Sequence, residues 1–244
     1  GPEFYRLGFG EAVEKGLLTD YKVLVLAVDE EVAAETTQRS VTDSDGMLTL
    51  DDTSKIIGCW NGLAKRSGRD QDGKDGFESA EAPMQRAVAF ARDIKSSEHF
   101  TEAFPYVTEN FAESLREKSA VNEMRTTPVS VHNLDLRLEA QHVDGGMNAL
   151  TRGEKLAWLK APVPDNECRI LTNARCLSEG VDVPALDAVL FLNPRNSVVD
   201  VVQSVGRVMR KSPDKKYGYI ILPVGVPAGM EPSRALADNR RFKV

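Results

Sequence analysis

The sequence predicts an α/β fold: a mostly parallel sheet of about six strands with helices on both of its faces. Short apolar runs recur along the 244 residues, and segments with the periodicity of a helix lie between most of them. Strands that alternate with helices favour a parallel sheet with right-handed crossovers. Polar residues follow several of the apolar runs, and sheets of this kind bind ligands where their strands end.

Each strand is predicted from a run of apolar residues, many of them β-branched. The run over residues 21–28 is almost continuously apolar, which is typical of a parallel strand that is buried on both faces. Residues 136–143 instead alternate between apolar and polar. The predicted strands are residues 21–28, 87–94, 136–143, 168–171, 188–192 and 217–222.

The helices follow from apolar residues three and four positions apart. We expect Asp52, Thr53 or Ser54 to cap one of them. Residues 32–51 are polar and predicted to be loop, and residues 67–83 form a linker rich in Gly, Asp and Glu. We therefore interpret residues 1–244 as one domain with an inserted region at about 32–83. The predicted helices are residues 9–17, 52–66, a helix from Ser96 or Ser97 that holds Phe100 and Phe104, 107–119, 147–159, and one that carries residues 203–210.

Composition is ordinary for a soluble globular protein, with 41% hydrophobic and 28% charged residues. No apolar run approaches the roughly 18–20 residues that span a bilayer, so we expect no membrane partner. Cys59, Cys168 and Cys176 have no metal-ligand spacing and no supporting histidine pair, so we expect no metal site. We interpret them as reduced core thiols of a cytoplasmic protein.

Charge is distributed unevenly along the chain. The net charge is −6, but residues 203–244 carry nine Lys and Arg and three Asp and Glu, a balance of +6 that leaves −12 for the rest. A local basic face can bind phosphate groups even when the whole protein is acidic. The chain begins without Met and stops within a helical pattern, so we expect a piece of a larger protein.

The first strand is followed by Asp29 and Glu30, in the form of a Walker B site. The alternative is a strand end followed by the charged start of a helix. We favour this alternative, because the sequence has no Gly-x4-Gly-Lys-Ser/Thr loop to hold a nucleotide phosphate. A Gly-x-Gly-x-x-Gly dinucleotide fingerprint is also missing at this position, which argues against a Rossmann-type enzyme.

A basic helix is the first candidate site. Helical spacing places Gln203, Arg207 and Arg210 on one face and turns Val205, Val208 and Met209 toward the sheet. Gly206 would let a ligand or another backbone approach closely. Two arginines on one face suit the spread charge of a nucleotide γ-phosphate, although a solvated basic face would have the same pattern.

The turn after the fourth predicted strand is the second candidate. Thr172 ends that strand, where a free hydroxyl and backbone N–H commonly hold nucleic-acid phosphates. Gly180 and Asp182 follow in a tight turn, and a carboxylate there can accept a hydrogen bond from a ribose hydroxyl or from an arginine. A turn-forming Asp without a ligand is the alternative.

Taken together, these two constellations resemble motifs V and VI of superfamily 2 helicases. The shared pattern is a strand with Thr172, a Glu-Gly-x-Asp-x-Pro turn, a strand, and a helix with Gln-x-x-Gly-Arg-x-x-Arg. The strand that ends at Arg92 looks like motif IV, and His142-Val-Asp144-Gly looks like the next block of the family. The resemblance covers most of residues 85–223. The sequence around Thr172 resembles that of bacterial DNA helicases of the DEAD/DEAH type, near the restriction-modification translocases.

The resemblance implies a RecA-like fold and a role for each residue. Arg210 would be the arginine finger on the γ-phosphate, Arg207 would contact the same phosphates, and Gln203 would order the water or nucleotide. ATP would also be bound around Gly180, Asp182 and Gly206. The nucleic-acid backbone would be held by four residues: Arg92, Thr172, Asn173 and His142. His142 is included because it lies at a strand end, although a histidine without a Ser or Cys partner pattern is ordinarily a surface or core residue.

The resemblance also implies what this chain lacks. The P-loop and the Asp-Glu box belong to the first motor domain of the family, so ATP and Mg2+ would be bound mainly by an N-terminal RecA-like domain that precedes Gly1. The expected activity is therefore ATP-dependent helicase or translocase action by a longer protein, on DNA rather than RNA, and this piece alone is expected to be inactive. The alternative is a RecA-like interaction module without catalysis.

Overall fold

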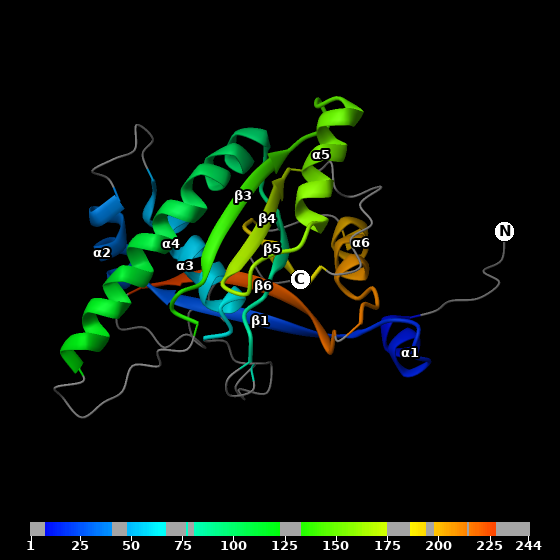
Figure 1. Cartoon of the computed structure of the whole chain (residues 1–244), viewed down its shortest axis with the longest axis horizontal. Coiled ribbons are helices and arrows are strands. Elements are labelled where there is room, and N and C mark those ends of the chain that lie inside the picture. Colours follow the sequence, from blue (N-terminus) through cyan, green and yellow to red (C-terminus); the bar gives the residue numbers. More distant parts are fainter. Residues whose placement is uncertain are drawn as a thin grey trace.

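The computed structural model describes residues 8–40, 48–66, 77, 81–122, 133–174, 186–193, 198–213 and 215–227. Its centre is one six-stranded sheet in the order β1-β6-β5-β2-β4-β3, and every strand pair is parallel. The predicted fold class is thereby confirmed (Figure 1). The strands are β1 (Asp20–Asp29), β2 (Arg86–Phe90), β3 (Arg137–Val143), β4 (Glu167–Asn173), β5 (Ala188–Phe191) and β6 (Tyr217–Val226).

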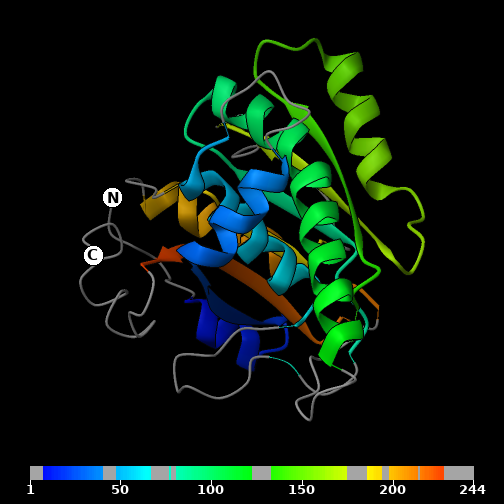
Figure 2. The same ribbon diagram turned by 90° about the vertical axis from the view of Figure 1, so that its left-hand side faces the viewer.

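Helices cover both faces of the sheet, in three layers (Figures 1 and 2). On one face lie α2 (Glu30–Ser40), α3 (Leu50–Leu63) and α4 (Ile94–Asn122). On the other lie α1 (Phe9–Glu14), α5 (Ala149–Lys160) and α6 (Val198–Val208). Alternate residues of β2 enter the two cores: Ala87 and Ala89 face α3 and α4, and Val88 and Phe90 face α6.

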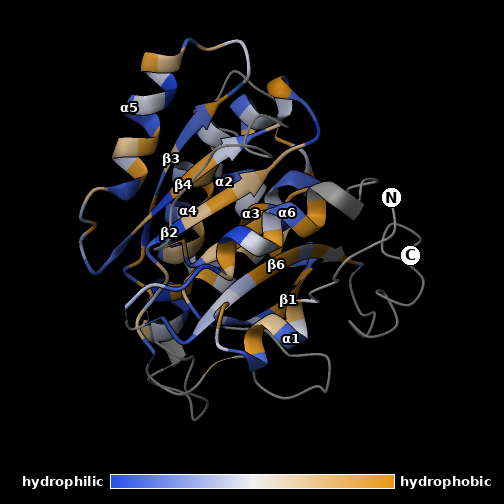
Figure 3. Ribbon diagram, turned by 90° about the vertical axis from the view of Figure 1, so that its right-hand side faces the viewer, coloured by the Kyte–Doolittle hydropathy of each residue, from blue (hydrophilic) through white to orange (hydrophobic). Residues whose placement is uncertain are grey.

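The central strands are apolar on both sides because helices cover both sides. Ala188, Val189 and Leu190 of β5 are all buried. The edge strand β3 contacts both a helical layer and solvent. Its residues therefore alternate in burial, with Arg137 and Glu139 exposed and Leu138 buried. Figure 3 shows this difference as a largely hydrophilic β3 beside the more hydrophobic β4.

The prediction of loop over residues 32–51 is wrong for its first part, because α2 follows β1 directly. Asp29 Oδ1 accepts a hydrogen bond from the Glu31 N–H at 2.8 Å, which caps the helix. Two glutamates in the first turn also favour the helix through its dipole. The interpretation of Asp29 and Glu30 as a strand end and helix start is therefore confirmed.

The helix α3 begins at Leu50, earlier than predicted, and its cap is Thr49. The Thr49 hydroxyl accepts from the Asp52 N–H at 3.1 Å, so none of the three predicted capping residues has that role. The pair of predicted helices on either side of Pro105 is also wrong, because α4 is one helix of 29 residues. Phe104 and Val107 are buried in the same core on either side of the proline. Their burial offsets the roughly 3 kcal/mol that an interior proline costs a helix.

The described cysteines fit the prediction of core thiols. Cys59 and Cys168 are free and fully buried, and burial raises the pKa of both thiols. Cys176 lies outside the described residues. None of the helices in the described ranges combines the length and the apolar character that crossing a membrane requires.

Candidate functional site

The structure divides the predicted site residues between opposite edges of the sheet. Arg92, His142, Thr172 and Asn173 lie at the carboxyl ends of β2, β3 and β4. Helix α6 starts beyond the carboxyl end of β5 and runs back across the sheet. Its end lies beside the first residues of β1 and β6, where the Thr19 N–H donates to the Met209 carbonyl at 2.8 Å. Arg207, near the end of α6, and Arg210, just beyond it, are therefore at the amino edge.

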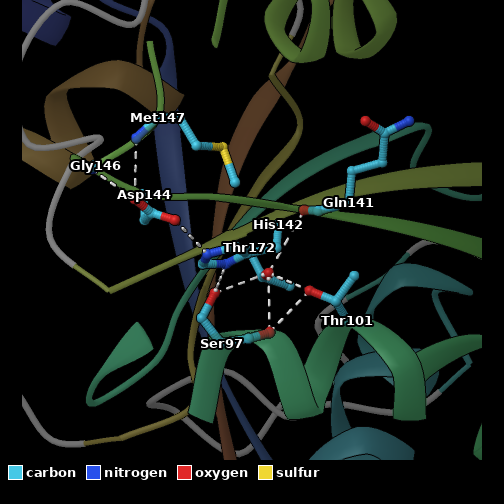
Figure 4. A network of polar contacts seen from close by, with 8 residues as sticks. All are labelled: Ser97, Thr101, Gln141, His142, Asp144, Gly146, Met147 and Thr172. Atoms are coloured by element: carbon cyan, nitrogen blue, oxygen red, sulfur yellow. Dashed lines mark hydrogen bonds and ion pairs between the residues drawn. The ribbon is translucent and has the colours of Figure 1, made fainter. Parts of the chain in front are cut away.

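At the carboxyl edge, a buried polar network joins α4 to β3 and β4 (Figure 4). The Ser97 hydroxyl lies 2.7 Å from His142 Nδ1 and 2.9 Å from Thr172 Oγ1. Thr172 Oγ1 also lies 2.5 Å from the Thr101 hydroxyl and donates to the Ser97 carbonyl at 3.1 Å. The network is closed by His142 Nε2, which lies 3.1 Å from Asp144 Oδ2.

This network corrects the expectation of a free Thr172 hydroxyl. Thr172 and Asn173 are fully buried, and His142 is 8% exposed. Buried hydroxyls need hydrogen-bond partners, and Ser97 in the first turns of α4 supplies them instead of capping the helix. The cap of α4 is Asp93, whose Oδ1 accepts from the Ser96 N–H at 2.7 Å. In this structure Thr172 and His142 hold α4 against the sheet.

Asp144 connects the network to the turn that follows β3. Its Oδ1 accepts from the N–H groups of Gly146 at 2.6 Å and Met147 at 3.2 Å. Burial alone raises the pKa of Asp144, but the hydrogen bonds from Gly146 and His142 outweigh it and hold the pKa below its usual value. The carboxylate is therefore ionised at neutral pH and fixes the turn.

A cleft of about 640 Å³ opens beside this turn, at the start of α4. Arg92 lines this cleft, and its side chain is 74% exposed. It forms an ion pair with Asp93, with 3.0 Å between Arg92 Nε and Asp93 Oδ2. Lys95 adds a second exposed cation, which was not among the predicted site residues. Its position in the first turn of a helix after a strand end is the pattern that would have identified it. The cleft is lined by Arg92, Asp93, Ile94, Lys95, Asp144, Gly145 and Ala174.

At the amino edge, the apolar side of α6 is placed as predicted. Val205, Val208 and Met209 are buried, and Gln203 is exposed. The expected single helical face is interrupted, because α6 ends at Val208 and Arg210 lies in the turn beyond it. The Arg210 N–H donates to the Arg207 carbonyl at 3.2 Å. We call residues 207–210 the arginine turn.

Glycines set how closely other elements approach α6. A Cβ on Gly206 would lie 3.8 Å from the ring of Phe9, so α1 lies on the side where a ligand or another backbone was predicted to approach. A Cβ on Gly218 would lie 2.4 Å from the Val208 carbonyl oxygen, so β6 needs glycine where it passes under the end of α6.

Gly180 and Asp182, predicted to bind ATP, lie outside the described residues. Across the part of the chain that is described, no cluster of His, Cys, Asp and Glu could hold a metal ion.

Comparison with known proteins identifies this arrangement. Residues 107–212 match the family described as helicase conserved C-terminal domain. The structure of the ATP-dependent Type ISP restriction-modification enzyme LlaBIII bound to DNA is 42% identical over 98% of this chain, with a TM-score of 0.77. A fragment assigned to the HsdR subunit of a type I restriction enzyme from Vibrio vulnificus shares the fold, with 18% identity over 91% of this chain and a TM-score of 0.51.

A shorter match links the chain to a viral protein. A protein of African swine fever virus named as a probable helicase is 46% identical over 57 residues, which is 23% of this chain. The chain spans 7% of that viral protein and 14% of the restriction-modification enzyme. The fold and the matched segment thus define a RecA-like helicase domain. Residues 107–212 therefore carry a helicase conserved C-terminal domain, in agreement with the resemblance of the motifs to superfamily 2 helicases.

Proposed function

We propose that this chain is the second motor domain of an ATP-dependent DNA translocase or helicase. The observation that carries the proposal is the separation of two sites that present cationic side chains. The arginine turn lies at the amino edge of the sheet, and the cleft beside Arg92 lies at the carboxyl edge. One rigid sheet then joins a site suited to a nucleotide phosphate to a site suited to a nucleic-acid backbone.

The ATP side of the proposal uses the arginine turn. ATP and Mg2+ would be held mainly by an N-terminal RecA-like domain, and closure of the two domains would bring Arg207 and Arg210 to the γ-phosphate. Guanidinium groups match the geometry of phosphate oxygens and stabilise the charge that spreads over them during transfer. Gln203, exposed on α6, would face the same interface.

The nucleic-acid side uses the cleft at the start of α4. Arg92 and Lys95 would contact phosphates of the tracked strand, because both are exposed and cationic. Their position depends on the network of Ser97, His142 and Thr172, which holds α4 against β3 and β4. The LlaBIII structure, 42% identical over nearly the whole chain, is of an ATP-dependent enzyme bound to DNA, and this favours DNA as the partner.

Replacement of Arg210 in the full-length protein tests this function. We expect Arg210→Ala to lower DNA-stimulated ATP turnover by roughly 10³-fold or more, the loss typical of an arginine finger. Lys211→Ala is the matched control, because Lys211 is an exposed cation next to the arginine turn, and it should retain turnover. Wild-type turnover by Arg210→Ala would refute the motor role and favour a RecA-like interaction module.

A further inference from the structure

The backbone carbonyls of the arginine turn are held by groups from other parts of the chain. The Met209 carbonyl accepts from the Thr19 N–H at 2.8 Å, just before β1. The carbonyls on either side, those of Val208 and Arg210, both accept from the ammonium of Lys215, at 2.5 and 3.3 Å. Three successive carbonyls, from the last residue of α6 to Arg210, are therefore anchored.

Lys215 is itself anchored to the sheet. Its ammonium donates a third hydrogen bond to the Leu186 carbonyl at 2.5 Å, and Leu186 is 1% exposed in the core before β5. An ammonium has three N–H donors, so the three carbonyls use all of them. The side chain therefore joins the last residue of α6 and Arg210 to a fixed point beneath β5.

Partial burial of the Lys215 ammonium has an energetic cost. Burial lowers the pKa of Lys215 to about 8, although the Asp187 carboxylate acts in the opposite direction. Asp187 is itself held at the same edge, where it accepts from the N–H groups of Gln85 and Arg86 at 2.9 Å each. An apolar side chain would avoid the desolvation of the ammonium but would remove the hydrogen bonds that it donates to the three carbonyls.

We propose that Lys215 is a positioning residue for the arginine finger: its ammonium fixes the backbone of residues 208–210 so that Arg210 is already oriented when the ATP cleft closes. The inference rests on the proposed motor function. Groups that stabilise transition-state charge act best when they need no rearrangement during the reaction. Loss of the tether should leave ATP binding largely intact and impair the chemical step.

The variant Lys215→Met in the full-length protein tests the inference, because methionine fills similar space without donors. With saturating DNA, we expect kcat for ATP to fall by about 10-fold or more, since a small misplacement of a catalytic group is costly. We expect KM for ATP and the affinity for DNA to change by less than about threefold. Lys216→Met is the matched control, because Lys216 is exposed and contacts the Tyr217 ring instead.

A double-mutant cycle separates positioning from general stability. If Lys215 acts through Arg210, adding Lys215→Met to Arg210→Lys should lower kcat by clearly less than it does in the wild type. An equal loss in both backgrounds, or wild-type kcat for folded Lys215→Met, would overturn the inference while Arg210→Ala still supports the motor function. Wild-type turnover by Arg210→Ala would overturn both. Should circular dichroism show Lys215→Met to be unfolded, the same criteria apply to Lys215→Gln.

Discussion

At the scale of single residues, buried hydrogen bonds change the roles that spacing predicts. His142 and Thr172 lie at strand ends, where contact with a ligand is expected, but their polar atoms bond to Asp144, Ser97 and Thr101. In a dry interior an unpaired polar group costs more than a typical hydrogen bond contributes, so such a network strongly favours one arrangement. These residues thereby shape the cleft without lining it, and Asp144 alone belongs to both network and cleft.

Acid should weaken the fold partly through Asp144. Its pKa is lowered in the folded protein, so the unfolded chain takes up the proton first and the stabilisation is fully present above the ordinary value of 3.8. It is lost as pH falls below that value, through the folded pKa. We expect Asp144→Asn to unfold with a free energy about 1 kcal/mol lower at pH 7 and to lose less stability than the wild type as pH falls from about 4 to about 2, roughly the window below the ordinary value in which the lowered carboxylate titrates.

Urea unfolding of the 244-residue chain over this pH range measures both effects. Asp165→Asn is the control, because Asp165 is exposed in the turn before β4. A pH dependence for Asp144→Asn that is as steep as that of the wild type would contradict the assignment.

At the scale of elements, close contact between α3 and β6 builds the core under the first helical layer. Two glycines one turn apart, Gly58 and Gly62, face β6. A Cβ on Gly58 would lie 2.9 Å from Pro223 Cβ, and one on Gly62 would lie 2.8 Å from Ile221 Cδ1. Proline is rigid and cannot move aside, whereas the end of an isoleucine side chain can rotate. Helix α3 therefore contains glycine, despite its poor helix propensity, because a larger residue would not fit against β6.

Alanine substitutions should separate helix propensity from packing. Gly58→Ala should lower the free energy of unfolding by about 1–3 kcal/mol, because overpacking against Pro223 outweighs the gain of about 1 kcal/mol in propensity. Gly153→Ala in α5 should raise it by about 0.5–1 kcal/mol, since nothing lies within 4 Å of the added Cβ. Chemical denaturation of both variants measures the difference, and equal changes of the same sign would show that α3 does not approach β6 so closely.

At the scale of the whole molecule, the sheet separates the two sites that present cationic side chains. The cleft of Arg92 and Lys95 and the arginine turn lie on opposite edges of the same sheet. Six parallel strands in register form a stiff connection between them. Mutations at the two edges should therefore affect different steps of the proposed cycle.

Substitution in the cleft should weaken DNA binding and reduce its dependence on salt. Binding of the full-length protein to DNA should fall steeply between about 50 and 200 mM salt, because phosphate contacts release counterions. Arg92→Ala with Lys95→Ala should reduce the slope of log K against log salt by up to about 2, and kcat at saturating DNA should be retained. Glu98→Gln in the next turn of α4 is an exposed control. An unchanged slope would place the phosphate contacts elsewhere.

Much of the fold was predictable because it depends on local pattern. Each strand of the sheet corresponds to an apolar run, and helical periodicity identified α1, α5 and α6, with boundaries displaced by a few residues. The helix α2 was missed because its residues are mostly polar and it is stabilised by the Asp29 cap and by packing of Ala33. The continuity of α4 through Pro105 could not be predicted, because it depends on a core assembled from distant segments.

The sequence by itself determined the class of this protein, because alternation of strands and helices and the spacing of Gln203, Gly206, Arg207 and Arg210 are properties of short segments. Tertiary structure alone decided how those residues are used. It buried Thr172 in a network with Ser97, brought Lys215 beneath the arginine turn, and put that turn and the cleft of Arg92 and Lys95 on opposite edges. The physical reason is that burial and hydrogen-bond partners come from residues far apart in the chain, whose meeting no local pattern records.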